Sequence, residues 1–158
     1  MFANNKLKTG TKQELKTTIM TEEKVQTFFR FEDLRLYGKT MVYAEWVYKK
    51  TQMFPESEAK TLIETFQTAA QNVPVLIAEG SALTRAIFVE FLNDARSCVR
   101  QCVVLTTLST NMGYLSPEEE NDSREMLIEI SKMLGALLTS LQKTNINIEK
   151  QPAVETDI

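Results

Sequence analysis

Apolar residues recur three and four positions apart along four stretches of the chain, which is the spacing of a buried helix face. The first stretch predicts a helix that begins near residue 22 or 31 and ends at Thr51, with a buried stripe of Leu34, Tyr37, Met41, Ala44 and Tyr48. The second predicts a helix that starts at Glu56–Glu58, after a break at Phe54-Pro55, and ends near Gly80. Pro74 lies inside this second run and is expected to kink it.

The third and fourth stretches predict two further helices. The third is expected to follow Thr84 as its N-cap and to end near Gly113, a residue type that suits a C-cap. The fourth follows Ser116-Pro117-Glu118-Glu119, where Ser116 and Glu119 have the spacing of a capping box and Pro117 suits the first helical position. We expect this helix to end at Lys143.

Four helices with short connections, and no strand signal, predict an all-α fold. We expect an antiparallel up-down-up-down four-helix bundle over residues 31–143. Residues 1–30 lack a clear apolar period and carry six Lys or Arg against three acids, which indicates a flexible basic arm, partly helical. Residues 144–158 have no helical period and are expected to form a disordered tail.

The first helix carries more apolar residues than one partner helix needs. Tyr43, Trp46 and Val47 widen its stripe, either because the core of a single chain is wide or because a second face is buried between subunits. We favour the second interpretation, in which the protein is a homo-oligomer and these three residues lie at the interface between its subunits.

The composition excludes several classes of enzyme. The chain contains no histidine, which removes Ser-His-Asp and Cys-His pairs, the usual zinc sites and the Glu-x-x-His pattern of di-iron bundles. Its five glycines do not form a phosphate-binding loop. A carboxylate-only metal site stays open, but no cluster points to one. We therefore expect a protein without catalytic residues, cofactor, metal or small-molecule substrate.

Cys98 and Cys102 lie four residues apart, which places both on one helix face but in poor geometry for a disulfide. We interpret them as small buried apolar residues, with a redox pair or half of a metal site as the alternatives. No run of about 18 apolar residues would span a membrane. Since the polar N-terminus also lacks a secretory signal, we expect a cytoplasmic protein without membrane contact.

Several short motifs occur in an order that resembles a known family. They are Phe31-Glu32-Asp33-Leu34, Phe54-Pro55, Val73-Pro74 followed by Ile77-Ala78-Glu79-Gly80, Phe88 with Phe91-Leu92, and Gly113-Tyr114-Leu115-Ser116. Over roughly residues 31–142 the chain resembles the four-helix-bundle proteins encoded in intervening sequences of bacterial 23S rRNA genes. The accessory subunit of diversity-generating retroelement reverse transcriptases shares that fold. The resemblance implies a homo-oligomeric ring, typically a pentamer, that associates with RNA or with a ribonucleoprotein such as a reverse-transcriptase complex.

The chain departs from the family pattern where basic and polar residues are usual. Gln67 and Thr68 occupy positions at which the family carries two basic residues, and Leu76 replaces the usual asparagine. Only one arginine, Arg85, lies between Gly80 and Phe88. The remaining candidates for contact with RNA phosphates are Arg85, Arg96, Arg100, Lys49 and Lys50. Arg96 and Arg100 share a helix face, so they either line a groove or form a solvated surface paired with acids.

Two further inferences concern carboxylates and the charge of the body. Glu79 stands at a helix end, where we expect it to cap backbone donors of the next helix, because no second carboxylate is positioned for catalysis. Residues 31–158 carry twelve Lys or Arg against eighteen Asp or Glu. This excess of acidic residues favours an alternative function, a protein-interaction scaffold without nucleic-acid binding. We nevertheless prefer RNA association as the function.

Overall fold

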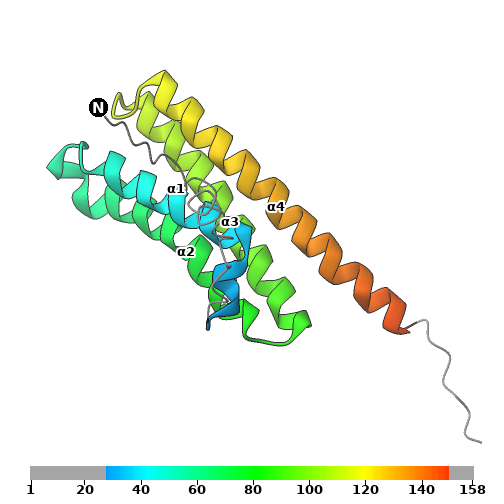
Figure 1. The fold of residues 1–158 in the computed structure, drawn as a ribbon. Helices are drawn as coiled ribbons and strands as arrows, with labels where there is room; N and C mark the ends of the chain where they lie inside the picture. Colours follow the sequence, from blue (N-terminus) through cyan, green and yellow to red (C-terminus); the bar gives the residue numbers. More distant parts are fainter. Residues whose placement is uncertain (1–27, 150–158) are drawn as a thin grey trace, which may run out of the picture.

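A computed structural model describes residues 28–149, with the backbone alone for Ala59 and residues 144–149. All regular elements of this range are helical, which confirms the all-α fold class. They are η2 (Arg30–Asp33), α1 (Arg35–Thr51), η3 (Glu56–Glu58), η4 (Ala59–Ile63), α2 (Glu64–Ser81), α3 (Arg85–Asn111) and α4 (Pro117–Glu149). The four α-helices lie alongside one another, and α4 projects well beyond the others at its C-terminal end (Figure 1).

Two boundaries differ from those expected. The first helix begins at Arg35 and is preceded by the short 3-10 turn η2, so the start expected near residue 22 or 31 is too early. The last helix continues to Glu149, six residues beyond Lys143, because no proline or glycine interrupts the chain there. Residues 144–149 are therefore helical and not part of a tail. Residues 1–27 and 150–158, which hold most of the expected arm and tail, lie outside the described residues.

The buried stripe of α1 differs in part from the one that its apolar spacing predicts. Leu36, Thr40, Tyr43, Val47 and Thr51 face the core, and so does Ala44 of the predicted stripe. Leu34 and Tyr37 are partly buried, whereas Met41 and Tyr48 are exposed. Two threonines can lie in the core because their hydroxyls donate to backbone carbonyls, at 2.7 Å from Thr40 Oγ1 to Tyr37 O and 2.9 Å from Thr51 Oγ1 to Val47 O. The sequence pattern missed this stripe because it counts threonine as polar.

Close contact between α2 and α3 depends on Gly80, which lies in the last turn of α2. A Cβ atom at this position would lie 2.7 Å from Phe91 Cβ and 2.8 Å from Phe88 Cδ2. The missing side chain thus lets the two phenylalanine side chains of α3 pack against the α2 backbone. Pro74 lies within α2 and is buried, and the helix continues through it.

The connection between α3 and α4 is fixed by hydrogen bonds at both helix ends. Gly113 has a φ of +76°, and its N–H donates to Thr110 O while Tyr114 N–H donates to Ser109 O, each at 2.9 Å. This is a Schellman motif, in which glycine supplies the left-handed residue. Ser116 and Glu119 then bond reciprocally, since Ser116 N–H donates to Glu119 Oε2 at 2.8 Å and Glu119 N–H donates to Ser116 Oγ at 3.1 Å. The start of α4 therefore has a capping box.

Candidate nucleic-acid interface

A groove of about 350 Å³ runs between α3 and the C-terminal half of α4. Arg96 and Arg100 line its α3 side, and the buried side chains of Val99 and Leu138 lie beneath them. The α4 side is built from small or polar residues: Ser131, Gly135, Thr139 and Gln142. Because Ser131 and Gly135 have little or no side chain, α4 leaves room beside the two guanidinium groups.

Arg96 and Arg100 are exposed, and neither makes an ion pair with a side chain that the structure describes. Both residues line the groove, and the described acids do not neutralise them. Two exposed guanidinium groups one helical turn apart can bind neighbouring phosphates, because each offers a planar set of N–H donors. A groove lined with arginines and hydroxyl groups is suited to a phosphate backbone.

Lys49 and Lys50 lie elsewhere, at the C-terminal end of α1, and both are paired with acids. Lys50 Nζ lies 2.6 Å from Glu119 Oε1 and 5.7 Å from the centre of the Trp46 ring. Its hydrogen bond is the main cause that lowers the pKa of Glu119. Lys49 lies 3.9 Å from Glu45 on the same helix. Lys50 is thus occupied in joining α1 to α4.

Arg85 is exposed as the first residue of α3. It lies eleven positions before Arg96, a rise of about 16 Å along the helix. Of the five basic candidates, therefore, the structure brings only Arg96 and Arg100 together in one groove.

Two of the three residues expected at a subunit interface lie in the core of the protein. Tyr43 is 1% exposed and Val47 is fully buried, so neither can contact a second copy. Trp46 is partly buried and stacks on Tyr43 with ring centres 6.1 Å apart. Helix α1 does carry apolar residues on its exposed side as well as on its buried side, but the exposed ones are Met41, Val42 and Tyr48.

The expected cap at Glu79 is absent, although the other two caps form the box at the start of α4. Glu79 is exposed within the last turn of α2, and its carboxylate makes no hydrogen bond that the structure records with the described part of α3. Thr84 is the N-cap residue of α3 by position, but its side chain makes no cap hydrogen bond. The N-terminus of α3 therefore lacks the side-chain caps that its sequence suggests.

A small polar cluster lies inside the bundle and joins three helices. Ser123 Oγ of α4 lies 3.1 Å from the Tyr43 hydroxyl of α1 and 2.8 Å from Thr106 Oγ1 of α3. Cys102 adjoins this cluster, and burial raises the pKa of its thiol to about 12. Burial also raises the pKa of Cys98. Both cysteines are free thiols, but only Cys102 is the buried residue that we expected, because Cys98 is partly buried. A raised pKa disfavours the reactive thiolate of each.

The α4 residues that complete the groove were not among the predicted site residues. A sequence signal for them exists, since Ser131, Gly135 and Thr139 recur every four residues on one helix face. That pattern marks a face of small side chains but does not say which helix lies opposite.

The described part of the chain shows neither a metal-binding cluster nor a membrane-spanning helix. No three His, Cys, Asp or Glu side chains among residues 28–149 gather as they would around a metal ion. In the same range, no helix has the length and apolar character needed to cross a membrane.

Comparison with known proteins supports the resemblance seen in the motifs. The model of a family described as 23S rRNA-intervening sequence protein matches residues 32–136, about two thirds of the chain. The match includes all of α1, α2 and α3 and the first twenty residues of α4, among them Ser131 and Gly135 of the groove. No curated protein matches the chain.

Proposed function

Because the chain belongs to the family of 23S rRNA-intervening sequence proteins, we propose that it is a non-catalytic helical-bundle protein that associates with RNA or a ribonucleoprotein. The observation that carries this proposal is the α3/α4 groove, where Arg96 and Arg100 lie together and are not neutralised by a described acid. The cytoplasm is the compartment that such a role requires. A reverse-transcriptase complex is the ribonucleoprotein that the resemblance suggests.

The proposed mode of binding is contact with the phosphate backbone and not with base edges. The groove offers guanidinium, hydroxyl and amide groups, all of which donate hydrogen bonds to phosphate oxygens. Gln67 and Thr68 stand where the family usually carries basic residues, and Leu76 stands where it usually carries asparagine, so fewer such contacts are available. We therefore expect moderate affinity that depends strongly on salt, because each neutralised phosphate releases counterions.

Self-association is part of the same proposal. An up-down-up-down bundle is supported by contacts that join the end of α1 to the start of α4, Lys50 to Glu119, and the start of α1 to the middle of α4, Arg35 to Glu129. We propose a homo-oligomeric ring of such bundles, with five subunits favoured by the resemblance. Several copies of one groove would bind a single RNA more tightly than one copy does.

The test compares binding of a short labelled single-stranded RNA at about 50 and about 200 mM salt. The wild-type chain should bind at the lower salt and lose affinity at the higher. The double variant R96Q/R100Q should reduce the slope of log affinity against log salt by about one to two. The matched control R85Q removes an arginine outside the groove and should change the slope much less.

Absence of any binding at about 50 mM salt would refute RNA association. Equal losses in R85Q and R96Q/R100Q would refute the groove as its site.

A protein-interaction scaffold without nucleic-acid contact is the second candidate. A hollow of about 420 Å³ with mostly apolar walls, between α1 and α2, favours it, since grooves of this kind bind amphipathic helices. Deletion of residues 1–29 should leave partner binding intact under this alternative. It should weaken RNA binding if the basic arm contributes to it.

A further inference from the structure

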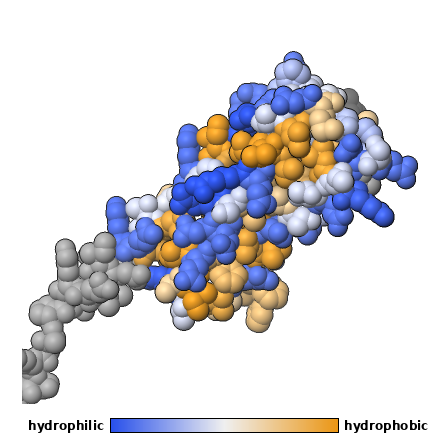
Figure 2. All heavy atoms as spheres, turned by 180° about the vertical axis from the view of Figure 1, so that it is seen from behind, coloured by the Kyte–Doolittle hydropathy of each residue, from blue (hydrophilic) through white to orange (hydrophobic). Residues whose placement is uncertain are grey.

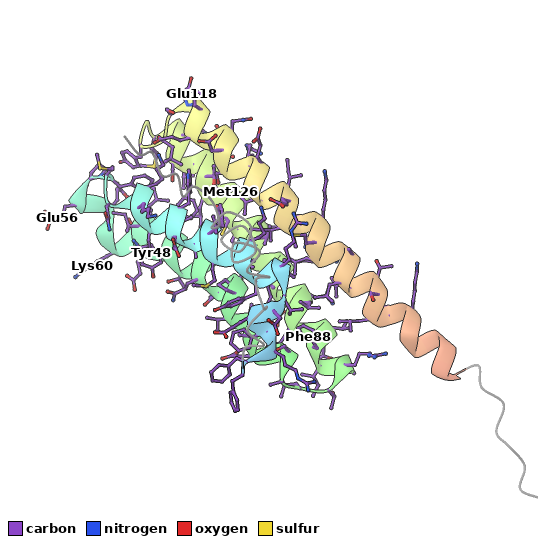
Figure 3. All side chains as sticks on the ribbon, in the orientation of Figure 1. Tyr48, Glu56, Lys60, Phe88, Glu118 and Met126 are labelled. Atoms are coloured by element: carbon purple, nitrogen blue, oxygen red, sulfur yellow. The ribbon has the colours of Figure 1, made fainter. Side chains whose placement is uncertain are left out.

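The hollow between α1 and α2, here the α1/α2 groove, has apolar walls that the core of the bundle does not use. The walls include Tyr37, Met41 and Tyr48 of α1 and Pro74, Val75 and Ala78 of α2. Tyr48 lies on the side of α1 next to α2 (Figure 3), and its hydroxyl donates to Gln71 Oε1 at 2.8 Å. Met41 and Val75 remain 37% and 46% exposed. An exposed apolar groove of this kind is suited to receive another apolar surface.

The chain itself enters the α1/α2 groove at one end. Phe31, which precedes α1, lines the groove and packs edge-to-face on Tyr37 with ring centres 5.0 Å apart. The Phe29 ring lies 5.9 Å from that of Phe31, and the Phe28 ring lies 5.2 Å from that of Phe29. A row of aromatic rings therefore leads from the groove to Phe28, the first described residue. Residues 1–27 are thus joined to the protein at the mouth of the groove.

This point of entry distinguishes the groove from other exposed apolar surfaces. Val104 and Leu108 of α3 are 65% and 43% exposed, and several apolar patches lie between hydrophilic regions in Figure 2. Exposure alone does not say what covers them. A segment tethered beside a groove, however, is present there at an effective concentration on the order of millimolar. It fills the groove even when each of its contacts is weak.

The sequence before Phe28 fits the groove in pattern and length. Leu15 and Ile19 lie four positions apart, so a helix of residues 12–20 places them on one face, with Lys12 and Lys16 beside them. Such a helix is about 13 Å long, and the α1 wall of the groove rises about 16 Å. Residues 21–27 span at most about 25 Å when extended, which is enough to turn the helix back onto the groove.

The charges of this segment and of the groove are opposite in sign. Residues 1–20 contain four lysines against one acid. Four exposed acids lie on the elements around the groove, namely Glu32 and Asp33 of η2, Glu45 of α1 and Glu79 of α2. Of these four, only Glu45 makes an ion pair with a described residue, Lys49 at 3.9 Å. Charge complementarity of this kind favours the contact and fixes its register.

We propose that residues 12–20 dock along the α1/α2 groove of their own copy, with Leu15 and Ile19 against its apolar walls and the lysines at its acidic rim. The inference goes beyond RNA association and does not depend on it. A partner protein that presents an amphipathic helix to the groove would first have to displace this segment.

Limited trypsin digestion of the full-length protein tests this docking, because a protease cuts a docked segment only while it is open. Cleavage after Lys16 should be about tenfold or more slower than in a synthetic peptide of residues 1–27. V75R places a positive charge among the apolar walls and should raise the cleavage rate to that of the peptide. The control V42R changes a residue of α1 that is 57% exposed and outside the groove walls, so it should leave the protection unchanged.

Co-expression of V75R with I19D separates docking within one copy from docking between copies. Each variant alone should lose the protection, one through its groove and the other through its segment. The Ile19→Asp substitution changes the mass of the tryptic peptide 17–24 and so shows which copy is cleaved. The segment of V75R should stay unprotected in the mixed preparation, because its own groove is blocked.

Each other result contradicts the proposal. Cleavage of the wild-type protein at the rate of the peptide would mean that the segment does not dock. Protection that V75R retains, or that V42R also removes, would exclude the α1/α2 groove as its site. Protection of the V75R segment by the I19D copy would place it in the groove of a second copy. Circular dichroism melts of each variant separate these results from unfolding, and none of them depends on RNA binding.

Discussion

The Tyr43 hydroxyl of α1 lies 3.1 Å from Ser123 Oγ of α4, and both groups are buried in the centre of the bundle. Ser123 also lies 2.8 Å from Thr106 Oγ1 of α3, so one serine joins three helices. No buried side-chain polar atom among the described residues lacks a partner. Because buried polar groups are costly when unpaired, this cluster favours one relative position of α1, α3 and α4.

We predict that S123A destabilises the protein by about 1–3 kcal/mol, because Tyr43 and Thr106 would each lose their common buried partner. Urea denaturation followed by circular dichroism measures the loss. The control S131A removes an exposed serine on the same helix and should change stability by less than about 0.5 kcal/mol. Equal effects of the two variants would show that the buried cluster does not contribute to stability.

Stability should fall at alkaline pH because of Tyr43 and Cys102. Burial raises the pKa of Tyr43, and it raises that of Cys102 from an ordinary value near 9 to about 12. Above pH 9 the unfolded chain therefore loses protons that the folded chain retains. The contribution is complete below that pH and is lost as the pH rises towards 12, at up to about 1.4 kcal/mol per pH unit for each group.

Urea denaturation between pH 7 and 11 tests this dependence, with C102A for comparison. Removal of the thiol should reduce the slope of stability against pH above pH 9, whatever its effect at neutral pH. Identical slopes for the two proteins would contradict a titrating role for Cys102.

Replacement of Gly80 should weaken the contact between α2 and α3. We expect G80A to cost about 1–3 kcal/mol, since its Cβ would overlap the Phe88 and Phe91 side chains. Gly38 provides the control because a Cβ at that position meets no atom within 4 Å. G38A should therefore stabilise α1 by about 0.5–1 kcal/mol, and thermal melts of the two variants should shift in opposite directions. A shift in the same direction would mean that helix propensity outweighs the close contact.

The capping box at Ser116 should contribute measurably to the stability of α4. We predict a loss of about 1 kcal/mol for S116A, because Glu119 N–H would no longer have a side-chain acceptor. S97A removes an exposed serine from α3 and should be neutral within about 0.5 kcal/mol. Urea midpoints compare the two variants, and an S116A midpoint equal to that of S97A would refute a stabilising cap.

The sequence by itself determined the four helices, the capping box, the glycine C-cap and the family. Each depends on residues close together in the chain: the recurrence of apolar positions, the Ser116-to-Glu119 spacing, and the left-handed conformation that Gly113 adopts readily. The end of α4 was less predictable because Thr144 to Glu149 neither favours a helix strongly nor breaks one.

Only the tertiary structure decided which face of each helix meets which neighbour. On α1 two apolar stripes lie side by side, and periodicity alone does not show which one is buried. Burial of the stripe with Tyr43 depends on partners from α3 and α4, and on threonine hydroxyls that bond to their own helix. The same limit applies to Arg96 and Arg100, whose shared face follows from their spacing, whereas the groove requires the small residues of α4 to lie opposite.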